Sequence, residues 1–313
     1  MAGGVGVNPL REALTDYLTV RRAMGFRLDR AEKLLGQFLG YLEQCGAEVI
    51  TIDHAVAWAT QPNGAAWWHR SRLSAVRGLA CYLHTLDPRT EVPPPDLIPG
   101  RQRRATPYLY SESEIRAVIA AARELPNPML AATYPALIGL LAVTGIRIGE
   151  AIALGTDDFD RHHDVLTVRH GKFGKARLLP LHPSTGEALR EYLRVRDRLR
   201  PTPVTDTLFV TSTGTRLDQS RVSKVFNRAA RQAGLVPRSA LCRPRIHDLR
   251  HGFAVGTLLD AYRRGEAVGS VIPRLATYLG HSDPKHTYWY LDAAPELLAF
   301  AADLLETHPG VLS

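Results

Sequence analysis

The first third of the chain repeats apolar residues at helical spacing. Residues 10–18 carry leucine or tyrosine every three or four positions, and residues 28–42 place their large apolar side chains on one stripe. Thr51 or Asp53 can cap a short third helix, and residues 67–86 show the stripe a fourth time. Because an amphipathic helix must cover its apolar stripe, the pattern predicts a compact four-helix unit.

A proline-rich stretch then interrupts the helical pattern between residues 87 and 107. Proline excludes regular helix and makes an extended, fairly stiff spacer. The end of this stretch also carries Arg101, Arg103 and Arg104. We therefore expect a helical domain at residues 1–100, a basic linker at 101–107 and a second domain at 108–313.

The second domain mixes helical and strand patterns. Ser111 and Glu114 have the spacing of a capping box that opens a helix. An apolar run at 130–143 predicts a buried helix that Pro135 kinks or starts. Two β-strands are expected at 165–168 and 176–181, with a short extended piece at 208–210, and further helices at 187–199, 220–233, 246–254 and 295–305. The fold class is therefore mainly α with a small β-sheet (α+β).

Composition and charge narrow the classes of function. The 313 residues are 45% hydrophobic and 22% charged, which is typical of a soluble globular protein, and the formal net charge of +8 favours nucleic acid, then an acidic membrane, as partner. No apolar run is long enough to span a bilayer, and no secretory signal pattern opens the chain. The three cysteines form no C-x-x-C pair, which argues against a zinc site or a disulfide framework and favours a reducing cytoplasm.

One short stretch, residues 246–254, concentrates cationic and protonatable side chains. His247, Arg250 and His251 stand at positions i, i+3 and i+4, which share one face of a helix. An arginine with two imidazoles suits an anionic oxygen better than a metal ion. Taken alone, a solvated basic face explains the stretch equally well.

Four other short boxes give this stretch its meaning. They are T-G-I-R-I-G-E with Arg147 and Glu150, G-K-F-G-K with Lys172 and Lys175, L-G-H with His281, and the tyrosines Tyr288 and Tyr290. In this order the boxes resemble those of the tyrosine recombinases, the phage-integrase family of site-specific DNA recombinases. The resemblance is close from about Tyr108 onward and only general before it. It implies an N-terminal helical core-binding domain that clamps DNA, followed by a tyrosine-recombinase catalytic domain.

The resemblance assigns the two arginines to the phosphate. A phosphodiester gains negative charge on the way to its pentavalent transition state, and guanidinium groups donate paired hydrogen bonds to its non-bridging oxygens. Arg147 and Arg250 would take the place of metal ions, so no metal is expected. Arg147 can instead pair with Glu150 three residues on. Both hold if Glu150 orients the arginine.

The same resemblance makes Lys172 the general acid that protonates the leaving 5′ oxygen. Lys175, three positions on, is the alternative. The family pattern resembles G-K-G-x-K-x-R, and Phe173 stands here where a second glycine is usual. The shape of this turn is therefore open.

The histidines and the nucleophile follow from the remaining boxes. His247 would accept the tyrosine proton or bind the phosphate, His281 would donate to a non-bridging oxygen, and His251 would support the site. Two structural histidines are the alternative. Tyr290 has the family's spacing from His281 and is the expected nucleophile, with Tyr288 as its rival.

Other basic residues are candidates for contacts with the DNA backbone, with a solvated surface as the alternative. They are Arg70, Arg72, Arg77, Arg101, Arg103, Arg104, Lys175, Arg243 and Arg245.

The implied activity is strand exchange through a 3′-phosphotyrosine bond and a Holliday junction. The resemblance implies four protomers on two sites, double-stranded DNA as partner, and no nucleotide cofactor because the covalent bond conserves the energy. The last helix, 295–305, would dock on a neighbouring protomer or on its own body. A cytoplasmic, nucleoid-associated protein is expected. A type IB topoisomerase and a non-catalytic DNA-binding protein on the same fold are the alternatives. Open points are the target sequence, any need for accessory proteins, and the choice among transposition, integration and dimer resolution.

Overall fold

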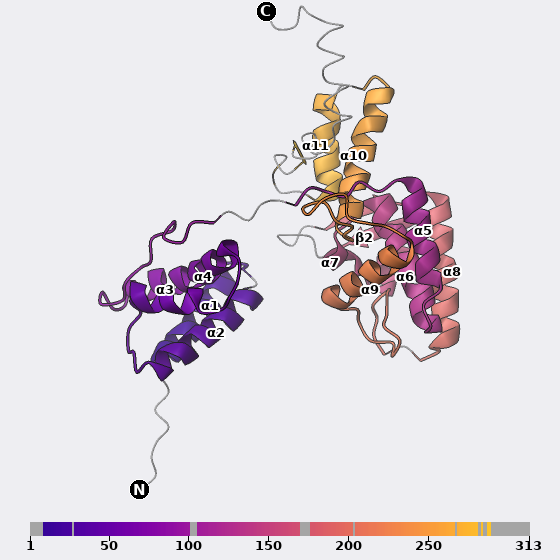
Figure 1. Ribbon diagram of the computed structural model, residues 1–313. Helices are drawn as coiled ribbons and strands as arrows, with labels where there is room; N and C mark the ends of the chain where they lie inside the picture. The colour runs from indigo at the N-terminus through magenta and orange to yellow at the C-terminus, as the bar shows by residue number, and fades with distance from the viewer. Residues whose placement is uncertain are drawn as a thin grey trace, which may run out of the picture. The chain divides into compact units, whose positions relative to one another are not determined.

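The computed structural model describes residues 9–26, 28–100, 105–169, 176–202, 204–266, 268–280, 283 and 287–288. By contacts within the chain it divides into two compact units, Met1–Arg104 and Ala105–Ser313 (Figure 1). Each unit has a hydrophobic core of its own, and we describe them separately.

The described part of the first unit is built from four helices. They are α1 (Pro9–Ala23), α2 (Asp29–Gln44), α3 (Ile52–Thr60) and α4 (Ala66–His84). The side chain of Thr51 caps α3 by accepting a hydrogen bond from the backbone N–H of His54 at 3.2 Å. Leucine and aromatic side chains of the four stripes meet in one core, in which Leu35, Phe38 and Leu79 are fully buried. The expected four-helix unit is confirmed.

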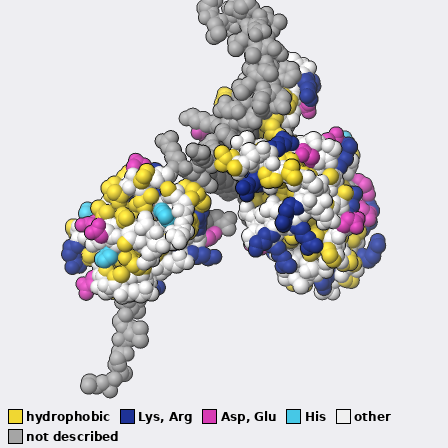
Figure 2. Space-filling view, in the orientation of Figure 1, with side chains coloured by type: hydrophobic (Ala, Val, Ile, Leu, Met, Phe, Trp, Pro, Cys, Tyr) yellow, Lys and Arg dark blue, Asp and Glu magenta, His cyan; other side chains and the backbone are white. Residues whose placement is uncertain are grey.

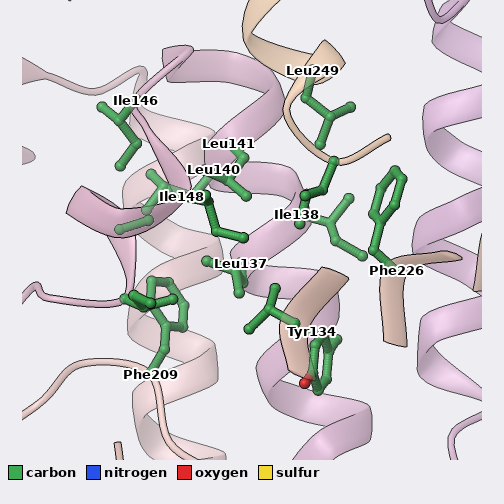
Figure 3. Close-up of a cluster of buried hydrophobic side chains, with 14 of the residues drawn as sticks. Tyr134, Leu137, Ile138, Leu140, Leu141, Ile146, Ile148, Phe209, Phe226 and Leu249 are labelled. Atoms are coloured by element: carbon green, nitrogen blue, oxygen red, sulfur yellow. The ribbon is translucent and has the colours of Figure 1, made fainter. Parts of the chain in front are cut away.

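The second unit surrounds a central apolar helix, α6. Its helices are α5 (Glu112–Arg123), α6 (Pro128–Thr144), α7 (Ile148–Ala151), α8 (Pro183–Leu199), α9 (Gln219–Gln232), α10 (Asp248–Arg263) and α11 (Val268–Leu279), with a 3-10 turn at Thr156–Asp158. The α6 helix packs against α5, α8 and α10. Figure 3 shows Tyr134, Leu137 and Ile138 of α6 in the core together with Phe209 and Phe226.

Local capping explains where these helices start. The predicted capping box opens α5, since Ser111 Oγ accepts from the N–H of Glu114 at 3.1 Å and Glu114 Oε2 accepts from the N–H of Ser111 at 2.7 Å. The helix α6 starts at the cap residue Asn127 and runs through Pro135. The expectation that Pro135 could start this helix is wrong, because the Asn127 side chain already satisfies the first turn, accepting from Leu130 N–H at 3.2 Å.

The small sheet is a three-stranded antiparallel meander. It comprises β1 (Phe159–Asp160), β2 (Val165–Val168) and β3 (Arg177–Pro180) in the order β1-β2-β3. Val168 pairs with Arg177, so the lysine-bearing residues 170–175 connect β2 to β3. The expected strands are confirmed, whereas residues 208–210 lie buried and form only an isolated bridge, between Val210 and Arg216.

The last two described helices, α10 and α11, share a separate apolar cluster that includes Leu258, Ile272 and Leu275. Gly145, directly after α6, lies against this pair with a positive φ of 59°. A Cβ at this position would lie 2.5 Å from Cδ1 of Phe253 on α10. Glycine therefore allows the turn after α6 to approach α10 closely.

The architecture is mainly helical with a small sheet, as the sequence predicts. None of the helices in the described part of the chain is long and apolar enough to cross a membrane.

Candidate active site

The arginine of the T-G-I-R-I-G-E box lies at the start of the short helix α7. Arg147 is the residue before the first turn, and Glu150 folds back so that its Oε2 accepts from the N–H of Arg147 at 3.0 Å. The Nη1 of the same arginine donates to Glu150 Oε1 at 2.8 Å. The three-residue spacing thus makes one carboxylate hold both the backbone and the guanidinium of Arg147.

The arginine of the second box reaches the same place from α10. The side chain of Arg250 is almost fully buried, and it donates to the carbonyl of Gly145 at 2.8 Å and to that of Leu279 at 2.9 Å. Arg147 donates to the carbonyls of Leu279 at 3.4 Å and Gly280 at 3.1 Å. Three boxes that are far apart in the sequence therefore meet at residues 145–150, 247–251 and 279–280.

The meeting point is the C-terminal end of α11. The last carbonyls of a helix have no partner within the helix and carry the negative end of its dipole, so they attract cations. Here the carbonyls of Tyr278, Leu279 and Gly280 accept from arginine side chains. Gly280, with a φ of 67°, ends the helix immediately before His281.

A third arginine, Arg177 of β3, completes the cluster. Its Nη2 donates to Glu150 Oε2 at 2.8 Å, its Nη1 to Glu150 Oε1 at 3.3 Å, and its Nε to the carbonyl of Tyr278 at 2.8 Å. Burial by itself raises the pKa of Glu150, but the hydrogen bonds and charges of Arg177 and Arg147 outweigh it, so the pKa lies below its ordinary value. Glu150 is therefore a carboxylate at neutral pH.

No role for Arg177 was predicted from the sequence. The signal that could have found it is its place as the final residue of the G-K-x-G-K-x-R pattern.

The histidines of the second box lie beside a buried carboxylate. Asp248, the first residue of α10, is fully buried and accepts from Arg245 Nε at 2.9 Å and Nη2 at 2.7 Å. The ring of His251 is buried, with Nε2 3.9 Å from Asp248 Oδ1, and its centroid lies 4.9 Å from that of His247 with the rings nearly perpendicular. Both His251 and Asp248 thus support the start of the helix that carries Arg250.

His247 keeps solvent exposure, yet its ring is crowded by protein and by cations. Desolvation lowers the pKa of His247 below its ordinary value, and the charges of Arg250, Arg245 and Arg147 lower it further, against a smaller opposite effect of Asp248. The imidazole is therefore mostly neutral at pH 7, with a nitrogen able to accept a proton.

Several predicted residues fall outside the described part of the chain. They are Lys172, Lys175, His281, Tyr290, Arg101, Arg103 and Arg104, and the helix expected at 295–305 also lies outside the described residues. The paired strand residues nearest the lysine segment are Val168 and Arg177, and Gly280 directly precedes His281. The rival tyrosine, Tyr288, is described and has half of its side chain exposed.

The candidate phosphate contacts of the first unit have different surroundings. Arg70 pairs with Asp96 at 2.6 Å on the surface, and Arg77 is half-buried. Arg72 is buried, with its guanidinium carbon 3.6 Å from the centroid of the Trp58 ring and Nη2 donating to the Trp58 carbonyl at 2.8 Å. The expected phosphate contact of Arg72 is therefore wrong, because the side chain is part of the core.

In the second unit, Arg243 is exposed, and Arg245 is half-buried with Asp248 as its partner. A larger basic surface, missed in the sequence, lies on α9 (Figure 2). Its exposed cations are Arg221, Lys224, Arg228 and Arg231. The inward face carries Val222 and Phe226. The alternation of basic and apolar residues at helical spacing was the available signal.

Comparison with known proteins agrees with these observations. The sequence model of the phage integrase family matches residues 109–296. A putative integrase/recombinase, y4rB of Sinorhizobium fredii, is 40% identical over 307 residues, covering 96% of this chain and 98% of that protein. Tyrosine recombinase XerD of Ralstonia nicotianae is 32% identical over 200 residues, or 64% of this chain and 60% of that protein.

A solved structure gives the corresponding likeness of fold. The XerH site-specific recombinase, bound to its palindromic difH substrate after cleavage, superposes with a TM-score of 0.62. It is 22% identical, with 87% of this chain and 78% of that chain covered.

Proposed function

Because the chain belongs to the phage integrase family and is a tyrosine-type site-specific recombinase, we propose that it cleaves and rejoins DNA through a 3′-phosphotyrosine intermediate. The phenolic oxygen of Tyr290 attacks phosphorus, and the bond from phosphorus to the 5′ oxygen breaks. A 5′ hydroxyl of a partner duplex then attacks the phosphotyrosine and releases Tyr290. Two such exchanges pass through a Holliday junction, and no external energy source is needed.

The observation that carries this proposal is the convergence of Arg147 and Arg250 on the end of α11, one residue before His281. Two permanently charged guanidinium groups at one point suit the dianionic oxygens of a phosphorane. The Arg147 side chain is 28% exposed, so solvent and a phosphate can reach it. His281 would add a hydrogen bond to the same phosphate.

Proton transfers are divided between two groups in this proposal. His247 takes the proton of Tyr290, for which its lowered pKa leaves a neutral nitrogen. Lys172, in the segment that connects β2 to β3 in the sequence, gives a proton to the leaving 5′ oxygen. Lys175 remains its rival.

Double-stranded DNA is the proposed partner, and the XerH recombinase of similar fold was solved bound to its palindromic difH substrate. An α-helix fits the major groove, and the basic face of α9 would meet phosphates there. Further backbone contacts are proposed for Arg70, Arg77, Arg243 and the linker arginines Arg101, Arg103 and Arg104. The first unit would then act as a DNA clamp.

We further propose that four protomers assemble on two paired sites, with the helix expected at 295–305 docked on a neighbour. Deleting residues 296–313 is then expected to spare binding to a single site and to abolish cooperative synapsis, measured by gel shift with one-site and two-site DNA.

The covalent step is tested by trapping it. A binding site is first selected from a random-sequence duplex pool, and nicks are then placed at successive positions so that the freed 5′ strand diffuses away. Wild-type protein is expected to accumulate a covalent adduct, and mass spectrometry to place the DNA on the peptide with Tyr290. Tyr290→Phe, which removes one oxygen, is expected to bind the site without forming adduct, while Tyr288→Phe still forms it.

The outcomes separate the alternatives. Binding without any adduct is the result expected of a non-catalytic DNA-binding protein and would overturn the proposal. Adduct formation with relaxation of supercoiled DNA, but without exchange between two sites, is expected of a type IB topoisomerase.

A further inference from the structure

We infer that Arg177 is a positioning residue of the active site, which balances the charge of Glu150 so that Arg147 keeps its positive charge available to the phosphate. The inference rests on the proposed function, since it deepens the role of the same cluster. It assigns a task to a side chain that contacts Glu150 and the end of α11, next to the arginines proposed to bind the phosphate.

The geometry places Arg177 at both supports of Arg147. The first support is Glu150, whose two carboxylate oxygens each accept from Arg177 and whose Oε1 also accepts from Arg147. The second is the end of α11, where Arg177 holds the carbonyl of Tyr278, adjacent in sequence to the carbonyls of Leu279 and Gly280 that Arg147 contacts. One guanidinium thus fixes the carboxylate and the peptide segment together.

The close packing of Arg177 leaves little freedom for another arrangement. Only 13% of its side chain and 5% of that of Glu150 are exposed. A Cβ on Gly280 would lie 2.8 Å from Nη1 of Arg177 and 3.0 Å from its guanidinium carbon. The guanidinium therefore lies directly against the turn that leads to His281.

The negative charge of Glu150 explains why a second cation is needed. A buried carboxylate paired with Arg147 alone would form a neutral pair, and its Coulomb attraction would be strong in a poorly solvated site. With Arg177 present the three groups carry a net charge of about +1. The negative charge of Glu150 is shared between two guanidinium groups, so Arg147 retains attraction for an incoming phosphate.

Charge balance predicts a specific pattern of rates. Arg177→Gln leaves the neutral Arg147–Glu150 pair and is expected to slow adduct formation by about 10- to 100-fold, less than the loss of a direct oxyanion donor. Adding Glu150→Gln removes the carboxylate that neutralises Arg147 and returns the net charge of the three positions to about +1. The double variant is therefore expected to form adduct at least about threefold faster than Arg177→Gln alone. Arg177→Lys, which keeps the charge, is expected to stay within about fivefold of wild type.

The experiment measures adduct formation by the full-length protein on the selected, nicked duplex, together with duplex affinity and the melting temperature of each variant. Arg190→Gln is the matched control, because Arg190 also binds two carboxylates, those of Asp164 and Glu187, but on α8. Its rate is expected to equal that of wild type. If Arg177→Gln fails to fold, Arg177→Lys and the double variant carry the comparison.

Three outcomes count against the inference in different ways. A wild-type rate for Arg177→Gln overturns the role of Arg177 alone. If the double variant is as slow as Arg177→Gln, or slower, then Arg177 acts only by holding its neighbours in place, and the charge-balance role is overturned. A wild-type protein that forms no adduct on its site removes the proposed function and this role with it.

Discussion

Arg147 and Arg250 donate hydrogen bonds to one main-chain oxygen, the carbonyl of Leu279, over 3.4 and 2.9 Å. The two side chains differ in burial, since Arg250 is 3% exposed as a residue and the Arg147 side chain 28%. Arg250 also binds the carbonyl of Gly145, so it connects the turn after α6 to the end of α11. It thus has a structural task as well as the proposed task at the phosphate.

This difference predicts different costs for the two arginines. Arg250→Ala would leave buried carbonyls without these donors and is expected to lower the free energy of unfolding by roughly 2–4 kcal/mol. Arg147→Ala leaves Glu150 paired with Arg177 and is expected to cost about 1 kcal/mol or less. Both are expected to slow adduct formation by about 10²–10³-fold. Urea denaturation checks the first pair of values, and equal destabilisation by the two substitutions would contradict the assignment.

The close approach of Gly145 to Phe253 predicts a second effect. Gly145→Ala combines a positive φ with a Cβ 2.5 Å from the Phe253 ring, and is expected to destabilise the fold by about 1–3 kcal/mol. Because Arg147 follows two residues later, cleavage is expected to fall as well. Gly149→Ala is the control: its Cβ would meet nothing within 4 Å, and Gly149 has no positive φ, so its melting temperature is expected to stay near that of wild type. A neutral Gly145→Ala would show that the turn relaxes freely.

Much of this site follows from short-range sequence patterns. The spacing of Arg147 and Glu150 predicts their contact, and the capping box at Ser111 fixes the start of α5, because both depend on backbone geometry over one helical turn. The strands β2 and β3, before and after the lysine segment, follow from their short apolar runs in the same way. The order of the boxes, through the family resemblance, supplied the proposed roles of residues that lie far apart.

Contacts between distant segments were not predictable in this way. Arg177 binds Glu150 across 27 positions of sequence, and nothing in the local pattern of β3 tells which carboxylate a strand arginine will meet. For Arg72 the sequence predicted a phosphate contact or a solvated surface. The side chain stacks on Trp58 instead, since a flat guanidinium can be buried against an aromatic ring. Charge in the sequence did not distinguish these two surroundings.

The proposed general acid gives a third prediction. Lys172→Ala is expected to slow cleavage by roughly 10²–10⁴-fold, because the 5′ oxygen would leave without a proton. A substrate with sulfur at the 5′ bridging position needs no proton to leave, and it is expected to restore much of the rate. Gel-resolved adduct formation on oxygen and sulfur substrates measures this. Rescue of Lys175→Ala in place of Lys172→Ala would move the role to Lys175.

The lowered pKa of His247 gives a prediction about pH. As the proton acceptor, the ring must be neutral, so the cleavage rate is expected to be level near neutrality and to fall only as pH drops below about 6.5, the ordinary histidine value. The rate falls as the pH drops through the lowered pKa of His247 in the folded protein, because the ring then gains a proton. Adduct rates between about pH 5 and 8 test this, and His247→Gln is expected to lose that limb. A rate that rises with acidity would instead assign His247 as a cationic donor to the phosphate.

The basic face of α9 gives the last prediction. If its cations meet phosphates, each contact releases counterions, and the logarithm of the DNA association constant falls against the logarithm of salt concentration by about 0.9 per contact. Replacing Arg221, Lys224 and Arg228 together with glutamine is then expected to flatten the measured slope by roughly 2 to 3. A matched control removes three cations that already pair with carboxylates, those of Arg116, Arg190 and Arg194. Because these three cations already pair with carboxylates and are not proposed to meet phosphates, the control slope is expected to stay near that of wild type. Fluorescence anisotropy across a salt series measures both, and equal slopes for the two triple variants would remove α9 from the DNA interface.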